Sequence, residues 1–207
     1  MPDSARFWDK RADGYAKSPI KDMESYERTL DRTRAHLSES DVALELGCGT
    51  GTTALLLAPS VRRLVATDLS TRMIEIAREK AAADRVEHVR FERATVFDDA
   101  LEPGSFDAVL AFNLLHLLDD LPGAVRRIHE LLKPGGTFVS KTICLAEQSR
   151  LWSVLLTIIR PLGFAPYVRC LKVDELEGIV TSAGFEIVEA DCQPVSPPSR
   201  FIVARRA

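Results

Sequence analysis

The chain has 207 residues and a formal net charge of −3, with 46% hydrophobic and 28% charged residues. These values are typical of one globular domain large enough to bury a core, and the slightly acidic balance argues against a nucleic-acid partner. The 4 cysteines are scattered without a metal-binding spacing, which predicts a reducing compartment and no metal site.

No segment of the sequence has the pattern of a signal peptide or of a membrane span. The N-terminus lacks an apolar core. The most apolar stretch, residues 151–168, is interrupted by Arg160, Pro161 and Pro166 and falls short of the roughly 20 apolar residues of a membrane span. We therefore expect a cytoplasmic protein without stable membrane insertion, while peripheral contact with a membrane surface stays open.

From residue 41 onward, short apolar runs alternate with amphipathic ones. Strands are expected over residues 42–46, 63–67, 86–91, 106–111, 137–144, 187–190 and 201–204, and helices over 52–58, 71–83, 121–132 and 173–183. Such alternation predicts an α/β fold with a parallel sheet covered on both faces. A short Pro-rich loop joins the last two strands, so we expect them to form an antiparallel hairpin at one edge.

The most informative stretch is the apolar strand that enters a loop with glycine at every second position, residues 47–51. Glycines let the backbone adopt conformations that a Cβ atom would obstruct, and they let a ligand approach the peptide planes. Open parallel sheets bind their ligands at the carboxyl ends of such strands. Because Thr52 stands where a dinucleotide fingerprint has its third glycine, the loop favours a nucleoside ligand other than NAD.

Four motifs, in this order and spacing, resemble those of the class I S-adenosylmethionine-dependent methyltransferases. The similarity is to the small-molecule group that includes the ubiquinone/menaquinone-biosynthesis enzymes. The motifs are residues 44–51 (LELGCGTG), 66–70 (ATDLS), 106–109 (FDAV) and 132–136 (LKPGG). The resemblance runs from about residue 41 to the C-terminus.

This resemblance implies a Rossmann-like fold with a mixed seven-stranded sheet, helices on both faces and a small helical cap. It also implies an N-terminal helical lid over residues 1–40 and a cofactor-binding domain over residues 41–207. An acceptor-side insertion is expected around residues 146–171. The implied cofactor is S-adenosyl-L-methionine, and the implied product is S-adenosyl-L-homocysteine.

The resemblance assigns the methionine end of the cofactor to the first motif. The residues concerned are Glu45, Leu46, Gly47, Cys48, Gly49 and Gly51. Cys48 is interpreted as a small residue that fits the turn rather than as a catalytic thiol. Asp68, at the end of the second strand, is expected to accept hydrogen bonds from the ribose hydroxyls or to cap the next helix. Leu69 and Met73 are expected to flank the adenine.

The third cofactor contact departs from the pattern of the family. Relatives usually carry Gly-Asp-Ala after the third strand, whereas residues 94–96 here are Ala-Thr-Val. The Thr95 hydroxyl and the Val96 amide can still hydrogen-bond an adenine ring. A neutral acceptor binds an amino group more weakly than a carboxylate does, which predicts reduced cofactor affinity unless Asp98 or Asp99 takes its place.

Four further residues are candidates for the reacting end of the site. Phe112 and Asn113 follow the fourth strand and are expected to face the donor methyl group. His116 is a candidate general base, although packing is the favoured interpretation. Tyr15 belongs to a segment, residues 7–15, that resembles the N-terminal segment of these enzymes. It is expected either to cover the sulfonium or to dock on the domain.

The segment over residues 146–171 is rich in apolar side chains and predicts an apolar acceptor pocket, a dimer interface or membrane contact. Arg150, Arg160 and Arg169 are alternative partners for an anionic acceptor. The predicted activity is methyl transfer to a small-molecule acceptor by in-line displacement, in a monomer or homodimer. The alternatives are a catalytically silent S-adenosylmethionine-binding regulator and, less favoured, a nicotinamide-dependent oxidoreductase.

Overall fold

The computed structural model describes residues 2–147, 167–195 and 198–207. Its strands are β1 (Val42–Leu46), β2 (Arg63–Asp68), β3 (Val89–Arg93), β4 (Phe106–Phe112), β5 (Leu132–Ile143), β6 (Phe185–Val195) and β7 (Pro198–Arg206). They form one seven-stranded sheet in the order β3-β2-β1-β4-β5-β7-β6. The pairs among β1 to β5 are parallel, and β7 runs antiparallel to both β5 and β6. The predicted mixed sheet with an antiparallel hairpin at one edge is confirmed.

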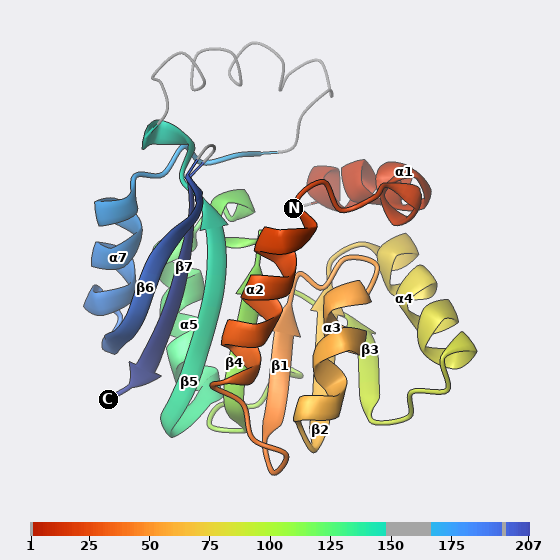
Figure 1. Ribbon diagram of the computed structural model, residues 1–207, viewed down its shortest axis with the longest axis horizontal. Coiled ribbons are helices and arrows are strands. Elements are labelled where there is room, and N and C mark those ends of the chain that lie inside the picture. The colour runs from red at the N-terminus through yellow and green to blue at the C-terminus, as the bar shows by residue number, and fades with distance from the viewer. Residues whose placement is uncertain (1, 148–166, 196–197) are drawn as a thin grey trace.

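Helices cover both faces of this sheet (Figure 1). They are α1 (Pro2–Lys17), α2 (Met23–Arg34), α3 (Thr52–Leu57), α4 (Thr71–Ala83), α5 (Leu121–Leu131) and α7 (Val173–Ser182). Helices α2, α3 and α4 bury apolar residues against one face, where Leu30 of α2 clusters with Leu110 and Val139. On the other face, α5 and α7 join a larger cluster that includes Leu44 and Ile128.

Local signals explain the elements that agree with prediction. All residues of β1 are buried, as expected for an inner parallel strand covered on both faces. Helix α4 spans residues 71–83 as predicted, because the Ser70 hydroxyl caps it by accepting a hydrogen bond from the Met73 amide at 3.1 Å.

Four strands differ from the predicted boundaries by more than one residue. Strand β3 begins at Val89 rather than at residue 86, because residues 84–86 still close the end of α4 and Arg85 has a φ of 55°. Strand β5 begins at Leu132, before the expected turn, and residues 133–136 form an irregularity in its pairing with β4. Strands β6 and β7 extend until Val195 pairs with Pro198, so the predicted loop is much shorter.

The two N-terminal helices have different roles. Helix α1 lies along α4, where Ala12 packs against Met73 and Ile76. Helix α2 instead packs on the sheet through Leu30, which is 4% exposed. The expected lid over residues 1–40 therefore consists of a cap, α1, and a helix of the central core, α2 (Figure 1).

The sheet order reverses between β1 and β4. The connections leave these two neighbouring strands in opposite directions, which opens a crevice at their carboxyl ends. The glycine loop follows β1, and residues 113–118 follow β4. The topology thus places the motifs of the first and fourth strands on either side of one crevice.

Candidate functional site

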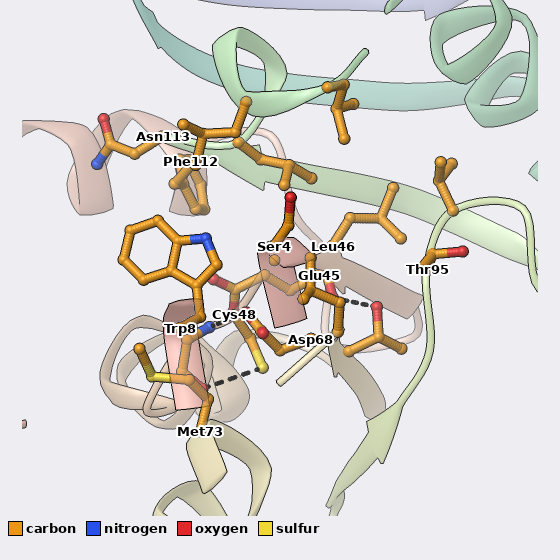
Figure 2. A pocket seen from close by; sticks show the side chains of 18 of the residues that line it. Ser4, Trp8, Glu45, Leu46, Cys48, Asp68, Met73, Thr95, Phe112 and Asn113 are labelled. Atoms are coloured by element: carbon orange, nitrogen blue, oxygen red, sulfur yellow. Dashed lines mark hydrogen bonds between the residues drawn. The ribbon is translucent and has the colours of Figure 1, made fainter. Parts of the chain in front are cut away.

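A cavity of about 500 Å³ lies at this point. It is lined by all but one of the predicted cofactor and catalytic residues: Tyr15, Glu45, Leu46, Gly47, Cys48, Gly49, Asp68, Leu69, Met73, Thr95, Val96, Phe112, Asn113 and His116. In Figure 2, Trp8 and Met73 lie on one side of this pocket and Thr95 on the other, with Glu45, Leu46 and Asp68 between them. The fold brings together side chains from motifs that are far apart in the sequence.

The loop after β1 needs its glycines for backbone shape and for space. Gly47 and Gly49 have φ values of 68° and 53°, in the left-handed region that L side chains rarely adopt. A Cβ atom on Gly47 would lie 2.8 Å from Leu114 Cδ1. The Gly49 amide donates a hydrogen bond to Asp68 Oδ2 at 3.0 Å, which ties the loop to the end of β2.

Gly51 is the exception, because it is not among the residues that line the cavity. It has a φ of 78°, and an added Cβ would lie 2.7 Å from Ala77 Cβ and 2.8 Å from Phe91 Cε1. The expected contact between Gly51 and the cofactor stays a prediction. This glycine allows α3 to begin close against α4 and β3.

Two carboxyl groups, the buried Glu45 and the partly buried Asp68, lie in the cavity wall. Glu45 is 2% exposed, and its Oε2 atom has no hydrogen-bond partner among the described residues. Burial, with a further contribution from Asp68, raises the pKa of Glu45 to about 8. Burial also raises the pKa of Asp68, although hydrogen bonds from the Ser70 and Gly49 amides oppose the shift. A ligand with a positive charge would offset the cost of burying these groups.

Asp68 does not cap α4, since Ser70 does. Its Oδ1 accepts a hydrogen bond from the Ser70 amide at 2.9 Å, and its Oδ2 accepts one from Gly49. These bonds hold the carboxylate in one orientation at the cavity wall. Because each carboxylate oxygen accepts more than one hydrogen bond, Asp68 retains capacity for two ligand hydroxyls.

After β3, Thr95 and Val96 line the cavity, whereas Asp98 and Asp99 do not. The Asp98 Oδ1 atom accepts a hydrogen bond from the Ala100 amide at 3.0 Å, so this carboxylate is bonded within its own loop. Phe97 also lines the cavity and is 40% exposed. Sequence reasoning missed Phe97, although an exposed aromatic side chain beside the departing motif was a usable signal.

Helix α1 closes one side of the cavity with Ser4, Trp8 and Tyr15. The Trp8 and Tyr15 rings meet edge to face, with centroids 6.4 Å apart. Asp9 fastens the helix, because its Oδ1 accepts hydrogen bonds from the Ser70 hydroxyl at 2.6 Å and the Arg72 amide at 3.1 Å. Ser4 and Trp8 were not predicted as site residues, since only the packing of α1 on α4 brings them here.

His116 and Asn113 occupy the turn after β4. Asn113 has a φ of 53°, and its backbone N–H donates a hydrogen bond to the Lys141 carbonyl at 2.8 Å. His116 is 7% exposed, and its Nδ1 atom has no partner among the described residues. Burial lowers the pKa of His116 to about 4, so the imidazole is neutral at pH 7. A base this weak is poorly matched to proton abstraction near neutral pH.

Asp107 is the second residue of β4, at the end of the strand opposite the cavity. It accepts hydrogen bonds from Lys133 Nζ at 2.7 Å and from the Val42 amide at 2.9 Å, as expected of a structural residue. In the acceptor-side segment, Arg150 and Arg160 lie outside the described residues. Arg169 forms an ion pair with Glu175 at 3.1 Å.

Within residues 2–147, 167–195 and 198–207, no group of three or more His, Cys, Asp or Glu side chains is arranged to hold a metal ion. Over the same ranges, none of the helices combines the length and apolar character needed to cross a bilayer.

The sequence and the fold of this chain are similar to those of known proteins. A family model for a methyltransferase domain matches residues 44–138. The mitochondrial arginine-hydroxylase NDUFAF5 of Danio rerio is 30% identical over 175 residues, which cover 81% of this chain and 52% of that protein. A ubiquinone biosynthesis O-methyltransferase of Xanthomonas euvesicatoria pv. vesicatoria (strain 85-10) is 29% identical over 187 residues, covering 88% and 76%. The chain thus spans about half of the first relative and three quarters of the second.

Among solved structures, a geranyl diphosphate C-methyltransferase from Streptomyces coelicolor A3(2) has a TM-score of 0.77 at 14% identity. The match covers 100% of this chain and 97% of that one, and it shows that the two proteins share a fold. That enzyme was solved with Mg²⁺, geranyl diphosphate and S-adenosyl-L-homocysteine. The methyltransferase family model, the O-methyltransferase relative and the shared fold support a class I S-adenosylmethionine-dependent methyltransferase, with S-adenosylmethionine as its cofactor. The predicted class, fold and cofactor are confirmed.

Proposed function

We propose that this protein transfers the methyl group of S-adenosylmethionine to a small-molecule acceptor. The observation that carries the proposal is the buried Glu45 carboxyl group and the partly buried Asp68, beside the left-handed glycine loop. The unpartnered Glu45 Oε2 atom and the spare acceptor capacity of Asp68 fit a ligand that carries both a cationic amino group and ribose hydroxyls.

Each wall of the cavity then has a role in holding the cofactor. Glu45 and the loop amides would hold the amino-acid end, and Asp68 would accept from the ribose. Leu69 and Met73 would flank the adenine, and Thr95 and Val96 would form hydrogen bonds with the edge of its ring. When bound, S-adenosylmethionine supplies a sulfonium methyl group that passes to an acceptor nucleophile while the bond electrons stay on sulfur, leaving S-adenosylhomocysteine.

The chain's contribution to the reaction is alignment and exclusion of water. Tyr15 and Trp8 on α1 cover the cavity, and Phe112 and Asn113 face it from the end of β4. His116 is neutral and weakly basic, so we assign it a positioning role beneath this turn. Tyr15 is assigned to covering the reacting centre. The acceptor's proton therefore leaves to solvent or to the acceptor's own groups.

Two functions other than methyl transfer are alternatives to this proposal. The relative from Danio rerio is named as an arginine-hydroxylase rather than a methyltransferase. A silent S-adenosylmethionine-binding regulator also fits every cavity residue, because the cavity reports cofactor binding and not acceptor chemistry. We retain methyl transfer because another relative, covered to 76% of its length, is named as an O-methyltransferase. The free cysteines fit a reducing, cytoplasmic setting.

Binding and turnover should be tested separately. S-adenosylmethionine, S-adenosylhomocysteine and NAD are titrated by calorimetry, and the first two are expected to bind. Transfer of a radiolabelled methyl group is then measured with a small-molecule metabolite extract, using heat-denatured protein as the control. Binding without transfer would favour the regulator. A protein that bound NAD alone would overturn the proposed function.

A further inference from the structure

A second cavity, of about 720 Å³, adjoins the cofactor site on the α2 side of the sheet. Its walls come from α2, the segment that joins α1 to α2, the start of α3, and β5. Six residues line both cavities: Tyr15, Cys48, Thr53, Phe112, Asn113 and Ile143. Among them, Phe112 and Asn113 are expected to face the donor methyl group and Tyr15 to cover the sulfonium. The second cavity is therefore placed to hold the body of an acceptor.

Lys141 is the charged side chain on the sheet side of this cavity. It lies on β5 directly beside Phe112 of β4 and is half-buried. Its Nζ contacts the Thr29 hydroxyl at 2.8 Å, the Ser25 hydroxyl at 2.9 Å and the Ser25 carbonyl at 3.4 Å. In the part of the chain that the structure describes, no carboxylate lies within 4.0 Å of this ammonium group.

The charge of Lys141 is compensated only in part, because its hydrogen-bond partners are neutral and the carboxylate of Asp22 acts from beyond ion-pair distance. Buried charged groups are usually paired with an opposite charge, whereas the partners here are neutral oxygens. Burial lowers the pKa of Lys141, Asp22 opposes that shift, and Arg28 and Arg32 add to it. An anion in the cavity would supply the missing counter-charge.

The neighbouring polar groups are also suited to an anion. The Thr29 hydroxyl donates to the Ser25 carbonyl at 2.7 Å, so its oxygen is free to accept from Lys141. The Ser25 hydroxyl accepts from Lys141 and keeps its own proton for a ligand. Three charged side chains line the cavity, namely Lys21, Asp22 and Lys141. Asp22 Oδ1 accepts a hydrogen bond from the Ser25 amide at 3.0 Å as the N-cap of α2, and its negative charge partly offsets those of the two lysines.

We propose that the second cavity binds an anionic group of the methyl acceptor, a carboxylate or a phosphate, with Lys141 as its counter-charge and Ser25 as a hydrogen-bond donor. This inference rests on the proposed function, because it takes the adjoining cavity as the cofactor site. It assigns acceptor charge recognition to β5 and α2, instead of to the arginines of residues 146–171. The acceptor's apolar part would lie against Phe112 and Ile143, toward the cofactor.

The test uses the full-length protein saturated with S-adenosylhomocysteine and two probes, benzoate and inorganic phosphate, titrated separately at low salt. At least one probe should bind with a Kd in the millimolar range, and the two arms distinguish a carboxylate from a phosphate preference. Lys141→Gln retains a hydrogen-bond donor to α2 but removes the charge. It should weaken binding of that probe by about tenfold or more. Lys141→Arg should stay within about threefold of the natural protein.

Lys172→Gln is the matched control, because it removes an exposed lysine outside the cavity lining and should leave probe binding unchanged. The proposal is overturned if neither probe binds up to about 10 mM, or if Lys141→Gln binds the probe as the natural protein does. If Lys141→Gln fails to unfold cooperatively, Ser25→Ala serves instead and should weaken the probe severalfold. S-adenosylhomocysteine affinity is measured on every sample, so a failure of the cofactor site is seen separately.

Discussion

Glu45 and Asp68 occupy the carboxyl ends of two neighbouring parallel strands, β1 and β2. Side chains at these ends converge on the crevice where the sheet order reverses. Glu45 is buried there and Asp68 partly buried, and the charge of Asp68 raises the cost of ionising Glu45. At the scale of single residues, ionising these carboxyl groups costs free energy, and a cationic ligand can offset that cost.

The buried Glu45 predicts a distinct pH dependence of stability. Its pKa is about 8 in the folded protein and 4.5 in its usual state. The stability that protonated Glu45 contributes is fully present below 4.5 and is lost as the pH rises to about 8. Glu45→Gln should therefore show a smaller decline in unfolding free energy across this window. Denaturant unfolding at several pH values checks this, and parallel curves for the two proteins would contradict it.

Asp68 should contribute to cofactor affinity through charge-assisted hydrogen bonds. Such bonds contribute roughly 1.5–3 kcal/mol, so Asp68→Asn should weaken S-adenosylhomocysteine binding by about 10–100-fold. Calorimetric titration measures the effect. Asp99→Asn is the control, because this exposed residue does not line the cavity. Equal affinities for the Asp68 and Asp99 variants would remove Asp68 from the binding site.

At the scale of elements, α1 is held to the body of the protein at the N-terminus of α4. The Asp9 carboxylate accepts from the Ser70 hydroxyl and the Arg72 amide, a position where a helix favours negative charge. The hydrogen bond from Ser70 lowers the pKa of Asp9 below its usual 3.8. This contact is therefore ionised at neutral pH, and its contribution is lost only as the pH falls below 3.8.

Removing this contact should loosen α1 and expose the cofactor cavity. Asp9→Ala should weaken S-adenosylhomocysteine binding severalfold and speed proteolysis within residues 2–17. Its effect on global unfolding should be small, since few core residues belong to α1. Asp13→Ala is the control, because Asp13 is an exposed partner of Arg72, and such surface pairs add little. If both variants digest at the natural rate, Asp9 does not hold the helix.

At the scale of the whole molecule, the N-terminal residues tie both ends of the chain together. Arg32 of α2 donates to Glu189 at 2.7 Å and to Asp191 at 3.1 Å on β6, and it stacks 4.3 Å from the Phe201 ring. Leu30 adds a buried contact with Leu110 and Val139 at the centre of the sheet. Helix α2 is thus part of the structural core.

Two truncations should separate the roles of α1 and α2. A variant that lacks residues 1–18 should still unfold cooperatively, although with weaker cofactor binding. A variant that lacks residues 1–40 also loses the Leu30 contacts, and burial of one such side chain contributes about 1.5–3 kcal/mol. It should be less stable than the shorter truncation by at least this amount. Thermal and denaturant unfolding compare them, and equal stabilities would show that α2 is dispensable.

Much of this architecture was predictable from short-range patterns. The limits of α4 followed from Ser70 and the periodic apolar residues after it, and both β1 and the glycine loop were evident from adjacent positions. Their formation depends on local propensity and backbone freedom, which neighbouring residues express. The edge strands were harder to delimit, because β6 carries charged residues between its apolar ones and obtains its length from pairing with β7.

By itself, the sequence determined the class of the protein, its cofactor and the motif residues around Glu45, Asp68 and Asn113. The tertiary structure alone decided which further residues join them. It separated Gly51 from the cavity, brought Trp8 into it, and placed Lys141 against Ser25, 116 positions away. The physical reason is that a motif is a local property of the chain. The charge balance and shape of a cavity instead depend on contacts between distant segments, which only packing establishes.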